Sequence, residues 1–169
     1  MKTSYLIGII IIVVVIIITA IYLTFFSAPN VVVKGDNVSV FYTGYFTNGT
    51  VFNSNVGGSP FNFTAGSNQT IVGFDNAVLG MSLNQIKNVT IPPNEAYGEV
   101  NPNLVVVIPS NDFSNKTINV GSIITDSANG QPIQGVVLST NSTSTVVNFN
   151  SPLAGKTLIF SIKVVNIRK

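Results

Sequence analysis

Residues 73–83, GFDNAVLGMSL, are the segment whose pattern decides how the rest of the chain is interpreted. Apolar side chains recur there at the i, i+3, i+4, i+7 spacing of one helical face, namely at Phe74, Ala77, Val78 and Met81. Asp75 lies near the start, where a carboxylate suits the positive end of a helix. The pattern therefore predicts one short helix over residues 73–83.

Short strands are predicted on both sides of this helix. They share alternating or dense apolar residues and lie at 37–45, 50–53, 60–64, 86–91 and 158–167. Asn48-Gly49 is a strong hairpin turn signal between the first two strands. In the last strand, Leu158, Phe160, Ile162 and Val164 share one face. We expect an antiparallel β-sheet wrapped on one short helix.

The block from residue 101 to residue 149 has a different character. Short apolar runs at 104–108, 122–125, 132–139 and 143–149 are separated by turns rich in Asn, Gly, Ser and Thr. We therefore predict a small β-rich domain, residues 101–149, inserted into a first domain made of residues 28–100 and 150–169.

The N-terminus predicts a membrane anchor. Residues 5–26 are apolar and uncharged, and about 20 apolar residues of helix cross a hydrocarbon core of about 30 Å. A cleaved signal peptide is the alternative, but its apolar region is about 7–15 residues long. We expect an anchor within residues 1–27 and an α+β fold class that includes this transmembrane helix.

The direction of the predicted anchor rests on two weaker signals. Lys2 favours a cytoplasmic N-terminus. Seven Asn-x-Ser/Thr sequons follow the apolar segment, and together they fit an extracytoplasmic surface. The expected location is that of a single-pass membrane protein whose domain lies outside the cytoplasm.

The composition excludes several classes of chemistry. The 169 residues contain no cysteine and no histidine, so Cys/His zinc sites and His-dependent catalytic triads are excluded. Only 8% of residues are charged, which does not resemble a nucleic-acid-binding surface. We expect no cofactor, no metal, no nucleic-acid partner and a monomer.

Aromatic residues and short motifs follow one another in a distinctive order. Core packing alone would explain a single aromatic stripe, but the order of the motifs favours a functional site over core packing alone. The motifs are Phe41-Tyr42-Thr43-Gly44, Val51-Phe52-Asn53-Ser54, Pro60-Phe61-Asn62-Phe63, Ile71-Val72-Gly73-Phe74, Ala96-Tyr97-Gly98 and Leu158-Ile159-Phe160. In this order they resemble the FKBP family of peptidyl-prolyl isomerases, and the insert resembles the insert-in-flap domain of the SlyD-like branch.

The resemblance implies a role for each of eight residues. Five aromatic side chains would line a pocket for proline: Tyr42, Phe52, Phe61, Phe74 and Phe160. The backbone N–H of Ile71 would hold a substrate carbonyl, and the Tyr97 hydroxyl would donate a second hydrogen bond. Asn53 stands where many members of the family have aspartate, and this departure puts any role of a carboxylate at this position in doubt.

In the insert, an exposed apolar surface could bind unfolded or proline-containing polypeptides. Its candidate residues are Val105, Val106, Val107, Ile108, Phe113, Ile123 and Ile133, and the alternative is that they form the insert's own core. The predicted function is peptidyl-prolyl isomerisation assisting protein folding at the outer face of the membrane. A binding module that has lost the chemistry and a structural cell-surface β protein are the two alternatives.

Overall fold

The computed structural model describes residues 12–20, 30–113, 117–128 and 130–169. These residues are mostly β-structure, and the two α-helices among them are residues 12–20 and α2 (Val72–Val78). The rest of the predicted 5–26 segment, residues 5–11 and 21–26, lies outside the described residues.

The predicted transmembrane helix is wrong. None of the helices in the described ranges is both long and apolar enough to cross a membrane. The helical residues 12–20 rise by roughly 1.5 Å each, which gives less than half of a hydrocarbon core of about 30 Å. The sequence signal was apolar composition alone, and composition does not establish the length of a helix. Three further predictions are wrong for the same reason. They are the α+β fold class with a transmembrane helix, the membrane as a partner and the single-pass location.

The first of two sheets has five strands. These are β1 (Asn37–Phe46), β2 (Val51–Ser54), β3 (Phe61–Thr64), β4 (Ile86–Ile91) and β9 (Leu158–Arg168). The strands run in the order β2-β1-β9-β4, and β3 pairs with the first residues of β1. All pairings are antiparallel, and each predicted strand is present with its ends displaced by at most one residue.

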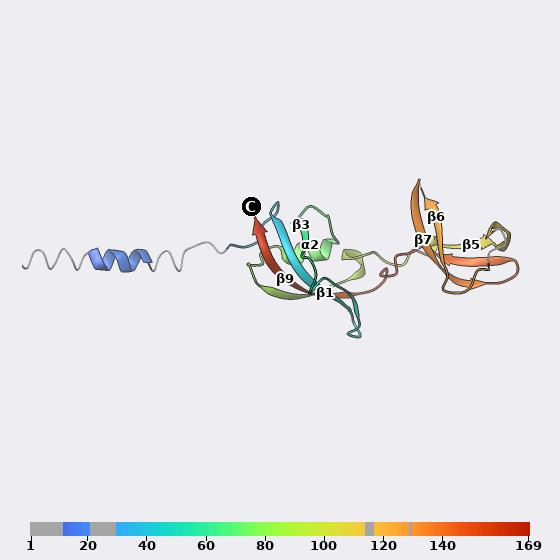
Figure 1. Cartoon of the computed structure of the whole chain (residues 1–169), viewed down its shortest axis with the longest axis horizontal. Coiled ribbons are helices and arrows are strands. Elements are labelled where there is room, and N and C mark those ends of the chain that lie inside the picture. The colour runs from blue at the N-terminus through green and yellow to red at the C-terminus, as the bar shows by residue number, and fades with distance from the viewer. Residues whose placement is uncertain (1–11, 21–29, 114–116, 129) are drawn as a thin grey trace, which may run out of the picture.

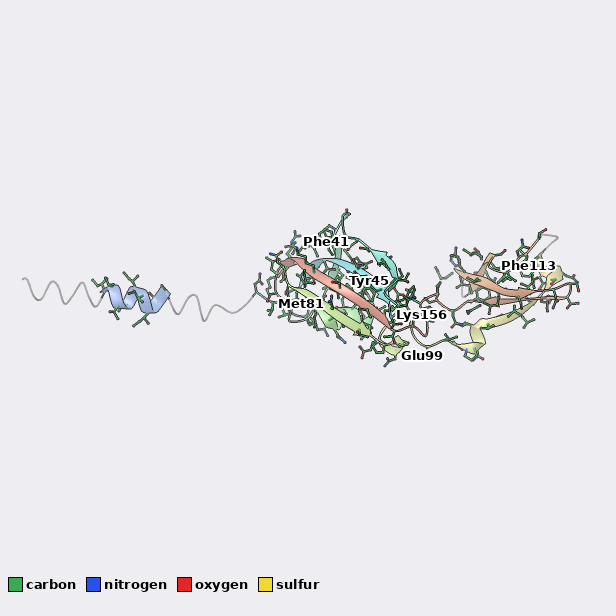
Figure 2. The ribbon with its side chains drawn as sticks, turned by 90° about the horizontal axis from the view of Figure 1, so that it is seen from below. Phe41, Tyr45, Met81, Glu99, Phe113 and Lys156 are labelled. Carbon is green, nitrogen blue, oxygen red and sulfur yellow. The ribbon has the colours of Figure 1, made fainter. Side chains whose placement is uncertain are left out.

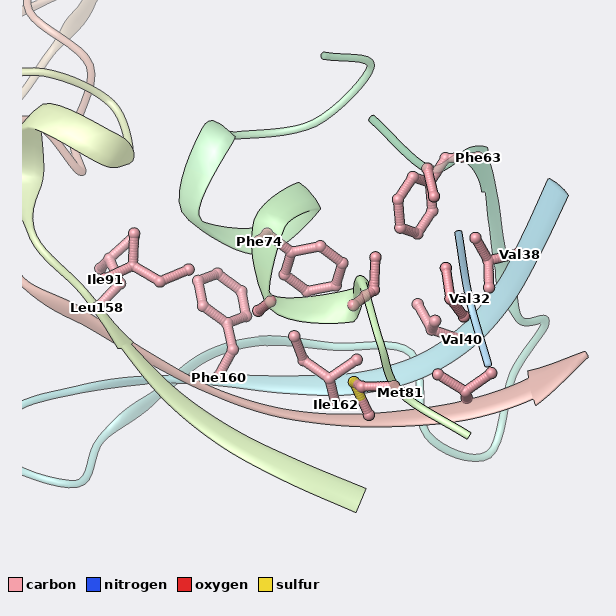
Figure 3. Close-up of a cluster of buried hydrophobic side chains, with 14 residues drawn as sticks. Val32, Val38, Val40, Phe63, Phe74, Met81, Ile91, Leu158, Phe160 and Ile162 are labelled. Atoms are coloured by element: carbon pink, nitrogen blue, oxygen red, sulfur yellow. The ribbon is translucent and has the colours of Figure 1, made fainter. Parts of the chain in front are cut away.

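The core lies between one face of this sheet and α2 (Figure 3). Strand alternation directs Val38 and Val40 of β1 inward, and both are fully buried. The face predicted for the last strand is confirmed, because all four of its apolar residues are buried in β9. Phe74 of α2 and Phe63 of β3 pack against them from above the sheet.

The helix α2 ends at Val78, five residues before its predicted end. The backbone leaves the helix at Leu79, which is extended with φ of −61° and ψ of 133°, and Gly80 follows in a left-handed conformation with φ of +77°. The chain then pairs with a distant segment, since the N–H of Gly80 donates to the carbonyl of Val32 at 2.9 Å. The Lys87 ammonium donates to the carbonyl of Ala77 at 2.9 Å and so satisfies one acceptor at the helix end.

The second sheet is built from residues between β4 and β9 and lies at the far end of the molecule from residues 12–20 (Figure 1). Its four strands are β5 (Val105–Pro109), β6 (Ile123–Ala128), β7 (Gln131–Thr140) and β8 (Ser144–Asn148), in the order β5-β8-β7-β6. Short 3-10 helices accompany them at η1 (Pro93–Glu95), η2 (Pro102–Leu104) and η3 (Ser110–Phe113). Its interior is small, with Val137, Thr145 and Val147 fully buried.

Two chain segments, residues 96–101 and 150–157, join the sheets, and together we name them the neck (Figure 1). The Asn150 side chain accepts from the N–H of Asn101 at 2.8 Å and donates to the Asn101 carbonyl at 3.0 Å. The N–H of Gly155 donates to the carbonyl of Gly98 at 2.8 Å. These bonds hold the outgoing and returning segments side by side.

Candidate functional site

A cavity of about 430 Å³ opens on the first sheet beside the start of α2. Ten residues line it: Tyr42, Phe52, Asn53, Phe61, Thr70, Ile71, Phe74, Tyr97, Leu153 and Phe160. All eight residues that the motifs single out are among them, although they come from six separate parts of the chain. Their proximity does not test their individual roles, which remain predictions.

Aromatic rings meeting edge to face form the floor of the cavity. Phe74 and Phe160, 3% and 5% exposed, lie at its base with their ring centroids 5.3 Å apart and their planes at 83°. Phe160 also meets Phe52 at 5.6 Å and 90°, and Tyr42 meets Phe74 at 5.6 Å and 81°. Aromatic pairs prefer this geometry, so the rings hold one another in place and make a dry, weakly polar wall.

Gly44 of β1 makes room for two of these rings. A Cβ atom at this position would lie 2.6 Å from the Phe52 ring and 3.1 Å from the Phe160 ring. Any side chain at residue 44 would therefore displace them. Glycine is needed at residue 44 because the two rings approach the backbone closely. Its backbone conformation does not require glycine, since Gly44 is not among the positive-φ glycines.

Two polar side chains meet at one edge of the floor. The Tyr42 hydroxyl donates to Oδ1 of Asn53 at 3.0 Å. Burial, and to a smaller extent the neighbouring Tyr97, raises the pKa of the Tyr42 hydroxyl above its usual value of about 10. None of the ten lining residues carries a carboxylate, an amine or an imidazole. The cavity is therefore uncharged at every ordinary pH.

Two donors at the rim have no partner among the described residues. The Tyr97 side chain is 46% exposed, and its hydroxyl makes no hydrogen bond within the described protein. The backbone N–H of Ile71 makes none either, although the Ile71 carbonyl accepts from the N–H groups of Phe74 and Asp75 at 3.0 Å each. A ligand with carbonyl groups could satisfy both donors.

Thr70 and Leu153 are lining residues that the motifs did not single out. Thr70 directly precedes Ile71, so its position follows once the loop is placed. Leu153 belongs to the returning segment of the neck, and Tyr97 belongs to the outgoing one. The neck thus supplies two walls of the cavity as well as the connection to the second sheet.

The structure distributes the candidate residues of the insert over two faces of the second sheet. Val107 pairs with Val146, and Ile123 pairs with Val136, on a face where Val107 and Ile123 are 63% and 66% exposed. We name this side the open face, and half-buried Val105 also belongs to it by alternation.

The other side of the second sheet, the packed face, carries Val106, Ile108 and Ile133 with the buried Val137 and Val147. Phe113 lies half-buried in η3, away from the first sheet (Figure 2). The seven candidates therefore do not form one continuous surface.

Comparison with known proteins finds sequence similarity over most of the chain. The sequence model of a family described as FKBP-type peptidyl-prolyl cis-trans isomerase matches residues 28–165. The FKBP-type peptidyl-prolyl cis-trans isomerase SlyD of Helicobacter pylori is 34% identical over 120 residues, covering 70% of this chain and 65% of that protein. A probable FKBP-type 16 kDa peptidyl-prolyl cis-trans isomerase of Pseudomonas fluorescens is 31% identical over 123 residues, covering 72% and 81%. The short-type peptidyl-prolyl cis-trans isomerase of Methanocaldococcus jannaschii is 36% identical over 109 residues, covering 64% and 68%.

Proposed function

Because this chain belongs to the family of FKBP-type peptidyl-prolyl cis-trans isomerases, we propose that it isomerises X–Pro bonds in unfolded polypeptides and so assists their folding. The observation that carries the proposal is the uncharged aromatic cavity with two unpartnered donors at its rim.

The chemistry fits the side chains that are present. Rotation about an X–Pro bond interrupts amide resonance, and uncatalysed exchange takes tens to hundreds of seconds. No covalent bond breaks, so no nucleophile is required. The twisted imide is less dipolar than the planar one, and a dry aromatic cavity therefore favours it over the ground state. The Ile71 N–H and the Tyr97 hydroxyl hold carbonyl groups on either side of the proline.

Replacing Tyr97 with phenylalanine tests the proposed rim donor. The variant is expected to lower kcat/KM on a short prolyl peptide by about tenfold, the effect of one hydrogen bond of roughly 1.4 kcal/mol. Its stability should stay unchanged, because the side chain is 46% exposed and its hydroxyl is unpartnered. A protease-coupled assay on the purified protein measures the rate.

Tyr45→Phe is the matched control for this variant. By strand alternation Tyr45 lies on the opposite face of β1 from Tyr42, and its hydroxyl also lacks a partner among the described residues. Equal losses in the two variants would contradict the donor role of Tyr97. Absence of turnover by the unmodified protein, together with suppressed aggregation of unfolded clients, would instead favour a binding module without catalysis.

The rate should be nearly independent of pH between about pH 4 and pH 9. The lining holds no carboxyl, amine or imidazole group, and burial raises the pKa of the Tyr42 hydroxyl further above that range. Exchange NMR on a prolyl peptide measures the rate without a protease. Asn53→Asp is the comparison, because it adds a carboxyl with a pKa of about 4 beside Tyr42 and should introduce an inflection in acid. An inflection of the same size in the unmodified protein would refute the prediction.

We further propose a second role for residues 101–149, as an inserted domain that binds unfolded chains beside an isomerase domain of residues 28–100 and 150–169. Two features support it. The open face exposes Val107 and Ile123, and β5 and β6 are the two edge strands of their sheet. An extended chain can add to an edge strand through backbone hydrogen bonds, with apolar side chains resting on the adjacent face.

A further inference from the structure

Asp75 is a buried carboxylate that the proposed chemistry does not use. It lies in the first turn of α2, next to the cavity floor residue Phe74, and it is only 2% exposed. None of the cations in the described ranges pairs with it, because the one ion pair there joins Lys169 and Asp36. A buried charge of this kind is costly unless hydrogen bonds compensate it.

The compensation comes from a single loop. Oδ1 of Asp75 accepts from the N–H of Gly66 at 2.7 Å, and Oδ2 accepts from the N–H of Asn68 at 3.0 Å. Both donors have left-handed backbones, with φ of +74° at Gly66 and +59° at Asn68. Asn68 is one of two such non-glycine residues in the described part of the chain. The carboxylate therefore holds the loop in a conformation that the chain would not adopt unaided.

Asp75 also forms a backbone hydrogen bond to the end of that loop. The N–H of Asp75 donates to the carbonyl of Ile71 at 3.0 Å. The carboxylate therefore fixes the loop at Gly66 and Asn68, and the backbone N–H of the same residue fixes its end at Ile71. The loop ends at Thr70 and Ile71, which line the cavity. The direction of the unpartnered Ile71 N–H depends on this arrangement.

We infer that Asp75 is a positioning residue, whose carboxylate holds the 66–71 loop so that the Ile71 N–H points at the substrate carbonyl. The inference rests on the proposed isomerase function. A hydrogen bond to a carbonyl away from the rotating bond is equally strong in the ground and transition states. Its loss therefore raises KM and leaves kcat unchanged. A general loss of folded protein would instead lower kcat and leave KM unchanged.

Asp75→Asn in the full chain is the direct test. Asparagine has the same shape but turns an NH₂ group toward one of the two N–H donors, so one bond is lost. We expect KM for a short prolyl peptide to rise about tenfold, since misaligning a hydrogen bond of roughly 1.4 kcal/mol has that effect, with kcat within twofold of the unmodified value. An unchanged KM, or a fall in kcat alone, would overturn the inference.

Asp36→Asn is the matched control. Asp36 is 4% exposed and accepts from the backbone N–H of Val33, but it lies away from the cavity beside Lys169. It should lose stability with no change in KM. A tenfold rise in KM for this variant as well would show that any buried carboxylate has the effect, and would refute the specific role of Asp75.

Two further variants keep the test decisive if Asp75→Asn does not fold. The Asn68 side chain is exposed, so Asn68→Ala adds only left-handed backbone strain to the same loop, whereas Asn68→Gly relieves it. KM should rise for alanine and stay unchanged for glycine, and equal KM values would count against the inference.

Hydrogen exchange at the Gly66 and Asn68 amides gives a readout that needs no activity. Exchange should accelerate locally in Asp75→Asn, and unchanged protection would overturn the inference. If the unmodified protein does not turn over the peptide, the proposed function fails, while the exchange result still decides whether Asp75 holds the loop.

Discussion

Phe160→Ala is expected to lower kcat/KM on a short prolyl peptide by about ten- to a hundredfold, and to lower the free energy of unfolding by about 3–5 kcal/mol. The Phe160 ring is 5% exposed and contacts the rings of Phe52, Phe74 and Tyr42. Its removal opens a void in the cavity floor, releases the neighbouring rings and admits water. Urea unfolding and the peptide assay measure the two effects separately.

Phe63→Ala is the control that separates stability from catalysis. Phe63 is equally buried, at 4% exposed, and packs on Phe61 at 5.3 Å and Phe74 at 5.9 Å, but it does not line the cavity. It should cost a similar free energy and reduce the activity of the folded fraction far less. If both variants lose the same activity per folded molecule, Phe160 has no special place in the cavity. Phe160→Leu serves where alanine prevents folding.

The double variant Val107→Ser and Ile123→Ser should slow catalysed refolding of a proline-limited protein by about tenfold, and should leave turnover of a short peptide unchanged. Both side chains lie on the open face and are more than 60% exposed. Removing apolar area there weakens client binding by about 1–2 kcal/mol, while the cavity in the first sheet is untouched. Refolding kinetics of a protein with a slow prolyl phase measure the first effect.

Ile86→Ser with Leu83→Ser is the matched control. These residues are 62% and 46% exposed and belong to the first sheet, at β4 and the turn before it. Their replacement removes similar apolar area from a surface that has no proposed role, so both assays should be unaffected. Equal slowing of refolding by the two double variants would mean that the open face is not a client site.

The strands could be predicted because their signals are local. Alternation placed Leu158 and Phe160 on the buried face of β9, whereas the grouping of Tyr42 with Phe74 in one site followed only from the resemblance of the ordered motifs to a family. Long-range contacts could not be predicted in this way. The helix end depends on pairing between Gly80 and Val32, and Leu153 reaches the cavity through the neck, where the sequence has no periodicity.

The lack of a local sequence signal also explains why the faces of the second sheet could not be predicted. The faces of the second sheet depend on a strand register that shifts between Val137 and Ser139, and composition does not encode such a shift. The N-terminal segment was mispredicted for a different reason. Its hydropathy is strong, but none of the helices in the described residues is long and apolar enough to cross a membrane.

The neck limits how far the open face can lie from the cavity. It carries Tyr97 and Leu153 as walls of the cavity, and its two segments are bonded to each other only a few residues before the second sheet begins. If the open face binds clients as proposed, a client held there would be tethered near the cavity, and each proline close to the held segment would meet it at an effective concentration on the order of millimolar. For such a client the prolyl step becomes unimolecular. Its rate would then follow the spacing between proline and held segment more closely than the affinity of the cavity for a free peptide.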